Sequence, residues 1–123
     1  MDLEILHTYC LSKPGVEECF PFDEHTLVFK VMGKMYALVP LERVPLQINL
    51  KCDPEKAIEL REEYPDLILP GYHMSKVHWN TVIFEYGLND SFIIDLINHS
   101  YDLVVSKLPK KLKEELSDIE SNS

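Results

Sequence analysis

Apolar residues recur along the first half of the chain with two different periods. After Asp2 they return every three or four positions, which predicts a capped helix as far as about residue 11. Pro14-Gly15 ends that period, and beyond it apolar and polar residues alternate, as is typical of strands with one buried face. We therefore predict a turn at Gly33-Lys34 between the middle two of four strands, which cover residues 16–20, 26–31, 35–39 and 45–51.

Asp53-Pro54 marks the next change, from alternation to a helix. An Asp cap satisfies free backbone N–H groups, and Pro is tolerated in the first helical turn, so a helix is predicted to begin here. Pro65 ends it after Tyr64. Beyond the turn at Pro70-Gly71, a run of aromatic and β-branched residues predicts a strand over 76–86.

The C-terminal end of the chain predicts two helices. Asn89 or Asp90 caps a long helix whose apolar residues repeat at four-residue spacing, so that one side of it covers a core. Pro109 ends this helix, and a shorter one follows. We predict a single domain over residues 1–116, with a polar and frayed tail at 117–123.

The order of these elements indicates the fold class. Amphipathic helices lie at both ends of the sequence, with antiparallel strands between them. We predict an α+β fold, a two-layer sandwich in which the N- and C-terminal helices pack on one face of an antiparallel sheet. The other face of the sheet is expected to meet solvent.

Alternation also predicts which side chains that solvent-facing side presents. They are Gln47, Asn49, Lys51, His78 and Asn80, joined by Lys30 and Lys76. The same alternation places Trp79 on the buried side. The outward set offers hydrogen-bond donors and cations but no carboxylate, which favours a shallow site for phosphate or another anion, including a nucleic-acid backbone. The alternative is an ordinary wet sheet face, polar because it faces water.

Charge is unevenly distributed along the 123 residues, which carry 12 basic and 21 acidic side chains and a net charge of −9. This total argues against indiscriminate binding of polyanions. Residues 1–25 hold one base against six acids, and residues 83–123 hold four against eight. Residues 26–82 hold seven of each, so a positive patch is expected only in the middle of the chain.

The sequence contains no recognised catalytic or metal-binding motif. It has no nucleophile elbow, P-loop, HExxH or glycine-rich dinucleotide loop, so we predict no enzymatic activity and no cofactor. His73, His78 and Cys52 lack a known ligand spacing, so no metal site is predicted. The three cysteines, which include Cys10 and Cys19, form no CxxC pair and are expected to be reduced and structural. Without a long apolar window or basic leader, we expect a cytoplasmic protein.

Four strings of residues carry a family resemblance. They are FKVMGKMYALV (29–39), INLKCDPEKAIELR (48–61), PGYHMSKVHWNTV (70–82) and SYDLVVSKLPKK (100–111). In order and spacing they resemble the MmcQ/YjbR family, and PFDEHTLVFKV fits the start of its second strand. The resemblance extends from the first helix to about Leu116.

This resemblance implies a fold similar to CyaY and frataxin, and a DNA-binding role. Some of the family's characteristic positions have structural explanations here, such as the helix start at Asp53-Pro54. Those without one are Asn49, Lys51, His73, Lys76, His78 and Asn80. With two lysines of the first hairpin, the predicted nucleic-acid or ligand-binding set is Lys30, Lys34, Asn49, Lys51, His73, Lys76, His78 and Asn80.

Three hypotheses for the function follow. The first is DNA binding by the polar and basic sheet face, which predicts clustered lysines and an affinity that falls steeply with salt. The second is an adaptor domain that binds a protein or a small anionic ligand, with a concave pocket and weak salt dependence. The third, from the frataxin resemblance, is iron handling by Asp2, Glu4, Glu17, Glu18, Asp23 and Glu24. We expect a monomer with no membrane partner.

Overall fold

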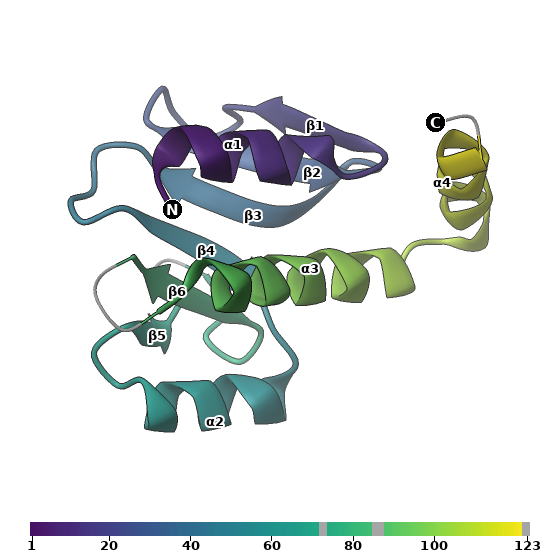
Figure 1. Ribbon diagram of the computed structural model, residues 1–123. Helices are drawn as coiled ribbons and strands as arrows, with labels where there is room; N and C mark the ends of the chain where they lie inside the picture. Colours follow the sequence, from purple (N-terminus) through teal and green to yellow (C-terminus); the bar gives the residue numbers. More distant parts are fainter. Residues whose placement is uncertain (72–73, 85–87, 122–123) are drawn as a thin grey trace.

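The computed structural model describes residues 1–71, 74–84 and 88–121 and has two layers, helices on one side and a sheet on the other (Figure 1). The elements are α1 (Leu3–Ser12), β1 (Val16–Cys19), β2 (Thr26–Val31), β3 (Lys34–Pro40), β4 (Gln47–Lys51), α2 (Pro54–Glu63), β5 (Ile68–Pro70), β6 (Trp79–Ile83), α3 (Asp90–Ser106) and α4 (Lys110–Ser121). The predicted α+β class is confirmed.

Six antiparallel strands form one sheet in the order β1-β2-β3-β4-β6-β5, with β1 and β5 at its two edges. The turn between β2 and β3 is Met32-Gly33, where φ is 49° and 84°. Two positive φ values suit the type I′ turn that matches strand twist. The predicted turn at Gly33-Lys34 is therefore wrong by one residue, because Lys34 already pairs with Val31 in the ladder.

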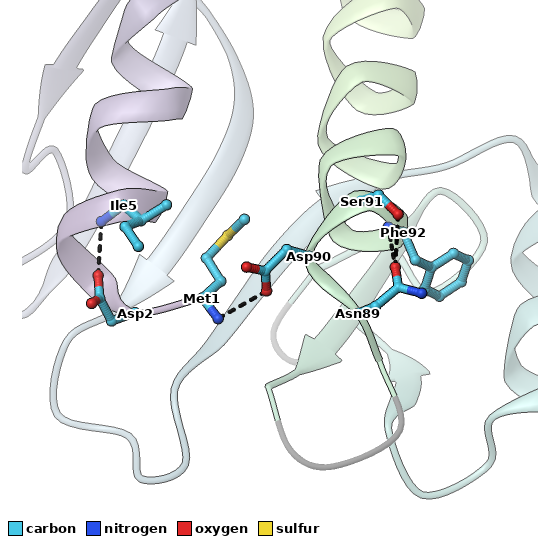
Figure 2. Close-up of polar contacts among 7 residues, drawn as sticks. All are labelled: Met1, Asp2, Ile5, Asn89, Asp90, Ser91 and Phe92. Atoms are coloured by element: carbon cyan, nitrogen blue, oxygen red, sulfur yellow. Dashed lines mark hydrogen bonds and ion pairs between the residues drawn. The ribbon is translucent and has the colours of Figure 1, made fainter.

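Side-chain caps fix where α1 and α3 begin (Figure 2). The Asp2 carboxylate accepts from the Ile5 N–H at 2.9 Å, which begins α1. The Asn89 side chain accepts from the Phe92 N–H at 2.8 Å and begins α3. The α-amino group of Met1 lies 2.9 Å from the Asp90 carboxylate, so the start of α1 is tied to the start of α3.

The main core lies between the sheet and helices α1, α2 and α3. It includes Leu6 and Cys10 of α1, Ala57 and Leu60 of α2, Ile93 and Ile97 of α3, and Phe29, Val39, Ile48 and Val82 of the sheet. Ser100 of α3 also bonds the sheet directly: its hydroxyl donates to the Tyr36 carbonyl at 2.6 Å and accepts from the Lys51 N–H at 2.9 Å. These contacts seat α3 across β3 and β4.

Several predicted boundaries differ from the structure, most of all those of the strand over 76–86 and of the last helix. The strand predicted over 76–86 is shorter, because β6 covers Trp79–Ile83 and residues 76–78 form a turn. The last helix continues to Ser121, past its predicted end near Leu116. Leu116 is buried, and Leu112 and Ile119 lie one turn to either side of it, so the apolar stripe of α4 does not stop there.

Candidate binding cleft

One cross-strand row sets the composition of the sheet face that the helices leave open. The register pairs Cys19 with Val28, Val28 with Leu38, Leu38 with Asn49, and Asn49 with Thr81. Residues that are directly opposite each other share one face of a sheet. Asn49 and Thr81 therefore lie on the open face, in line with two apolar residues.

The predicted orientation of β6 is wrong. Asn80 pairs with Leu50, a residue of the main core, so Asn80 lies on the helix-covered face. Trp79 lies on the open face, where it packs with Val28 and Leu38 in a second, smaller apolar cluster. Side chains alternate with a period of two, so an error of one residue in phase moves the whole strand to the opposite face. Half-buried Cys19, Met35 and Met74 complete that cluster.

Asn80 has a structural partner in α2. The Arg61 Nε donates to the Asn80 Oδ1 at 2.7 Å. One terminal nitrogen of the same guanidinium donates to the carbonyls of Lys76 and Trp79, the latter at 3.2 Å. Arg61 thus holds the turn that leads into β6, and the polar character of Asn80 is explained by this contact.

A cleft of about 560 Å³ opens on the uncovered face, where β3 ends and β4 begins. Its walls come from the loop before β2, the loop between β3 and β4, and Met74. The lining residues are Phe22, Asp23, His25, Thr26, Leu38, Pro40, Glu42, Arg43, Gln47, Asn49 and Met74. The cleft therefore combines an apolar part with amide and charged groups.

Two amides lie along β4 in the floor of the cleft, those of Gln47 and Asn49. Asn49 is only 8% exposed, and its Oδ1 accepts a hydrogen bond from the Thr81 hydroxyl. In this arrangement the amide oxygen faces Thr81. The amide N–H donors are then the groups that Asn49 can offer to a ligand.

Hydrogen bonds within the walls occupy the carboxylates of the cleft. Asp23 accepts from the backbone N–H of His25 at 2.8 Å and of Thr26 at 2.7 Å. These bonds, the one from His25 most of all, hold the pKa of Asp23 below its ordinary value. The His25 ring lies 3.1 Å from the Glu42 carboxylate, and the Leu41 N–H donates to the His25 carbonyl at 2.7 Å. The two wall loops are thus tied to each other.

A model of the YjbR family matches residues 11–103. The chain belongs to the YjbR family. It is 42% identical over 116 residues to the uncharacterized protein YbdF of Escherichia coli O157:H7, and the aligned region covers 90% of this chain and 93% of YbdF. It is 34% identical over 114 residues to the uncharacterized protein YjbR of Escherichia coli K12, which covers 93% of this chain and 96% of YjbR.

Solved structures agree with this YjbR assignment. The Deinococcus radiodurans protein DR2400, described as a DUF419 domain, matches with a TM-score of 0.87 and 41% identity over 94% of this chain and 87% of that one. A Pseudomonas syringae protein matches with a TM-score of 0.67 and 28% identity over 84% of this chain and 98% of that one. The fold observed here is therefore that of its YjbR relatives.

Within this YjbR domain, the predicted basic set is spread over several elements. Lys30 is half-buried on β2 and lies opposite Glu17 of β1, while Lys34 is exposed at the first position of β3. Lys51 is half-buried at the end of β4, where burial, and secondarily Lys107, lowers its pKa. Partial burial leaves less of the Lys51 side chain open to a phosphate.

Two further members, Lys76 and His78, lie in the turn before β6. Lys76 is exposed, and His78 is half-buried with its carbonyl accepting from the Cys52 N–H at 2.8 Å. His73 lies outside the described residues. In the described part of the chain, Asn49 is the one member of the predicted set that lines the cleft.

Most of the cleft residues were missed because they lie in loops. Phe22, Glu42 and Arg43 belong to no periodic pattern, so alternation carries no information about them. One signal was present: Asp23 followed closely by Thr26 is typical of an aspartate that bonds the backbone a few residues onward. That signal predicts an ordered loop, but it does not predict what the loop encloses.

The residues described by the structure form no group of three or more His, Cys, Asp or Glu side chains that could hold a metal ion. The acidic residues of the iron hypothesis are distributed over α1, β1 and the loop before β2. Across the same described residues, none of the helices has the length and apolar character needed to cross a membrane.

Proposed function

We propose that this YjbR-family protein is a non-enzymatic binding domain whose cleft takes a small organic anion, namely a carboxylate with an apolar body. The observation that supports the proposal is the cleft itself. Its volume, about 560 Å³, lies within the range of roughly 300–1,000 Å³ that is usual for small-molecule sites. Of the three hypotheses, the one that expected a concave pocket is the adaptor domain that binds a protein or a small anionic ligand.

The lining determines the class of ligand. Phe22, Leu38 and Met74 offer apolar surface to the body of a small molecule. Gln47 and Asn49 offer amide N–H donors from the floor, which suit an acceptor such as a carboxylate.

Arg43 lines the same cleft. Its guanidinium has five N–H donors, so it can serve a carboxylate in addition to a protein partner.

Charge in the walls disfavours a nucleic-acid backbone at this position. Asp23 and Glu42 place two carboxylates beside the mouth, where consecutive phosphates would meet like charge. A single carboxylate is less affected, because it brings one negative charge to the mouth where a nucleic-acid backbone brings several. DNA binding by the lysines outside the cleft stays a prediction, and we treat it as an outcome of the experiment.

Trp79 makes the experiment direct, because it is the only tryptophan in the sequence and packs with Leu38 and Met74, which both line the cleft. We would titrate the protein with phenylacetate, its neutral match phenylacetamide, inorganic phosphate, and a short DNA duplex at two salt concentrations. Tryptophan fluorescence and the amide spectrum would be recorded for each.

We expect phenylacetate to shift the side-chain amide signals of Gln47 and Asn49 and to bind at least tenfold more tightly than phenylacetamide. Asn49→Leu should abolish the shifts while Asn80 variants retain them. Equal binding of acid and amide, or no response to either, would contradict the proposal. Salt-sensitive binding of the duplex alone would replace it with the nucleic-acid hypothesis.

A further inference from the structure

A second depression, of about 490 Å³, lies between α1 and β1. Its lining consists of Leu3, Glu4, His7, Glu18, Phe20, Leu27 and Leu41, and we call it the α1–β1 groove. Phe20 lines this groove, whereas Phe22, two residues later, lines the cleft. The short segment after β1 thus contributes one aromatic ring to each depression.

The α1–β1 groove brings three exposed apolar side chains together. Phe20 is 50% exposed, Leu3 is 39% exposed and Leu41 is 36% exposed, and all three line the same depression. Scattered apolar residues are normal on a protein surface, but a contiguous group marks an interaction site. Aromatic residues such as Phe are enriched in the cores of protein–protein interfaces.

The rim of the groove is acidic. Glu4 and Glu18 line it, and both side chains are exposed. The one base among residues 1–25, Lys13, lies over the rings of Tyr9 and Tyr101 at the far end of α1. Its charge is therefore directed away from the groove, which leaves the rim with a negative potential.

From this combination we propose that the α1–β1 groove docks a basic amphipathic segment of a partner protein. Apolar side chains of the segment fill the space between Phe20, Leu3 and Leu41, and its lysines or arginines meet Glu4 and Glu18. Charge complementarity selects this occupant, because nucleic acid and anionic membranes would be repelled by the rim. A second copy of the chain would bring the same carboxylates together.

The groove is separate from the cleft, so the proposal does not depend on the proposed ligand. Leu27 and Leu41 connect the groove to β2 and to the loop between β3 and β4. Its lining includes a His7 ring that contacts the Glu18 carboxylate, which joins α1 to β1 across the depression. The docking surface is therefore built on two ordered elements.

The experiment uses the full chain labelled with nitrogen-15 and three synthetic peptides of equal length. The first has leucines at helical spacing with lysines between them, the second replaces each lysine with glutamate, and the third replaces each leucine with serine. We expect the first to bind at least tenfold more tightly than either of the others. Its shifts should centre on Leu3, Phe20 and Leu41.

Variants locate the contact. Phe20→Ser and Glu4→Lys should each weaken the lysine–leucine peptide at least fivefold. Phe22→Ser is the matched control, because this ring is 62% exposed and lines the cleft instead. The amide spectrum of each variant reports whether it folds. If Phe20→Ser does not fold, Leu41→Ser serves as the apolar substitution instead.

Four outcomes would overturn the proposal. They are equal binding of the glutamate peptide, equal binding of the serine peptide, an equal loss on Phe22→Ser, and no binding of any peptide. Sedimentation of the chain without peptide tests the remaining possible occupant, a second copy of the chain. A dimer that Phe20→Ser dissociates would assign the groove to a second copy and would also overturn the proposal.

Discussion

Asn49 and Asn80 occupy facing strands of the same sheet and are both buried, yet they serve opposite sides of the molecule. Asn80 lies toward the helices, where Arg61 of α2 bonds it and closes the space around it. Asn49 lies on the open face, bonded by Thr81 from the next strand, with a cleft in front of it. The two amides differ in what covers them, and that difference separates a structural polar group from a candidate binding group.

The largest effect is expected from removing Arg61, which covers Asn80 on the helix side. Arg61→Ala should lower the free energy of unfolding by about 2–3 kcal/mol, because the Asn80 amide oxygen and the Lys76 carbonyl lose their donor and the Trp79 carbonyl keeps only the Gly71 N–H. Urea unfolding followed by circular dichroism measures this. Glu59→Ala, an exposed change on the same helix, is the control and should alter stability by less than about 0.5 kcal/mol. A similar effect of both would contradict the structural role of Arg61.

Parallel substitution of the two asparagines sharpens the contrast. Asn80→Ala should cost about 1–3 kcal/mol of stability, since the Arg61 Nε is left without its acceptor, and should leave phenylacetate binding unchanged. Asn49→Ala should cost about 1 kcal/mol and weaken phenylacetate at least tenfold. Thermal unfolding and titration of both proteins provide the comparison. Equal effects on binding would show that the open face holds no special site.

The two asparagines also show how far the sequence could predict this structure. Helix starts were predictable because caps are local: Asp2, Asp53 and Asn89 each accept the N–H three residues onward. The alternation of β4 was predictable as well, and Asn49 does lie on the open face.

The orientation of β6 was not predictable, because Trp79 and Asn80 can each be buried and the phase depends on the register with β4. The cleft could not be predicted either. Its walls are loops, and their position depends on contacts such as that of His25 with Glu42, which lie far from any periodic pattern. Arg61 was missed because its partners come from another element.

Each face of the sheet has a titrating group whose pKa differs from its ordinary value, so the stability of each face depends on pH in a different range. We expect the larger effect on stability from His99, on the helix side. His99 of α3 accepts the Asp53 N–H at 3.2 Å, and burial, with a smaller effect of Lys56, lowers the pKa of His99 from its ordinary 6.5. Below pH 6.5 the unfolded chain binds the proton first. Stability from this group is therefore complete above 6.5 and is lost as pH falls toward the folded pKa.

His99→Gln tests this window by removing the titrating ring. The stability of the original protein relative to the variant should fall between pH 7 and pH 5, by less than about 1 kcal/mol because the half-exposed ring is partly screened. Urea unfolding at each pH measures it. A difference that is constant across this range would contradict the lowered pKa.

The smallest effect belongs to the wall of the cleft. Backbone hydrogen bonds hold the pKa of Asp23 below its ordinary 3.8, so its contribution is present above pH 3.8 and is lost as pH falls through the lower, folded value. Asp23→Asn should therefore unfold at a slightly lower temperature than the original protein near pH 6. The two melting curves should converge in strong acid, and a gap that persists there would contradict this assignment.

The two free edges of the sheet affect how the chain behaves at high concentration. Glu17 and Glu18 occupy adjacent positions on β1, so both faces of that edge carry an exposed carboxylate. On the other edge, β5 contains Pro70, which has no backbone N–H to donate. Charge at one edge and proline at the other are devices that oppose strand-to-strand aggregation. The sheet is therefore protected against growing into a cross-β polymer, even though its open face is only partly covered.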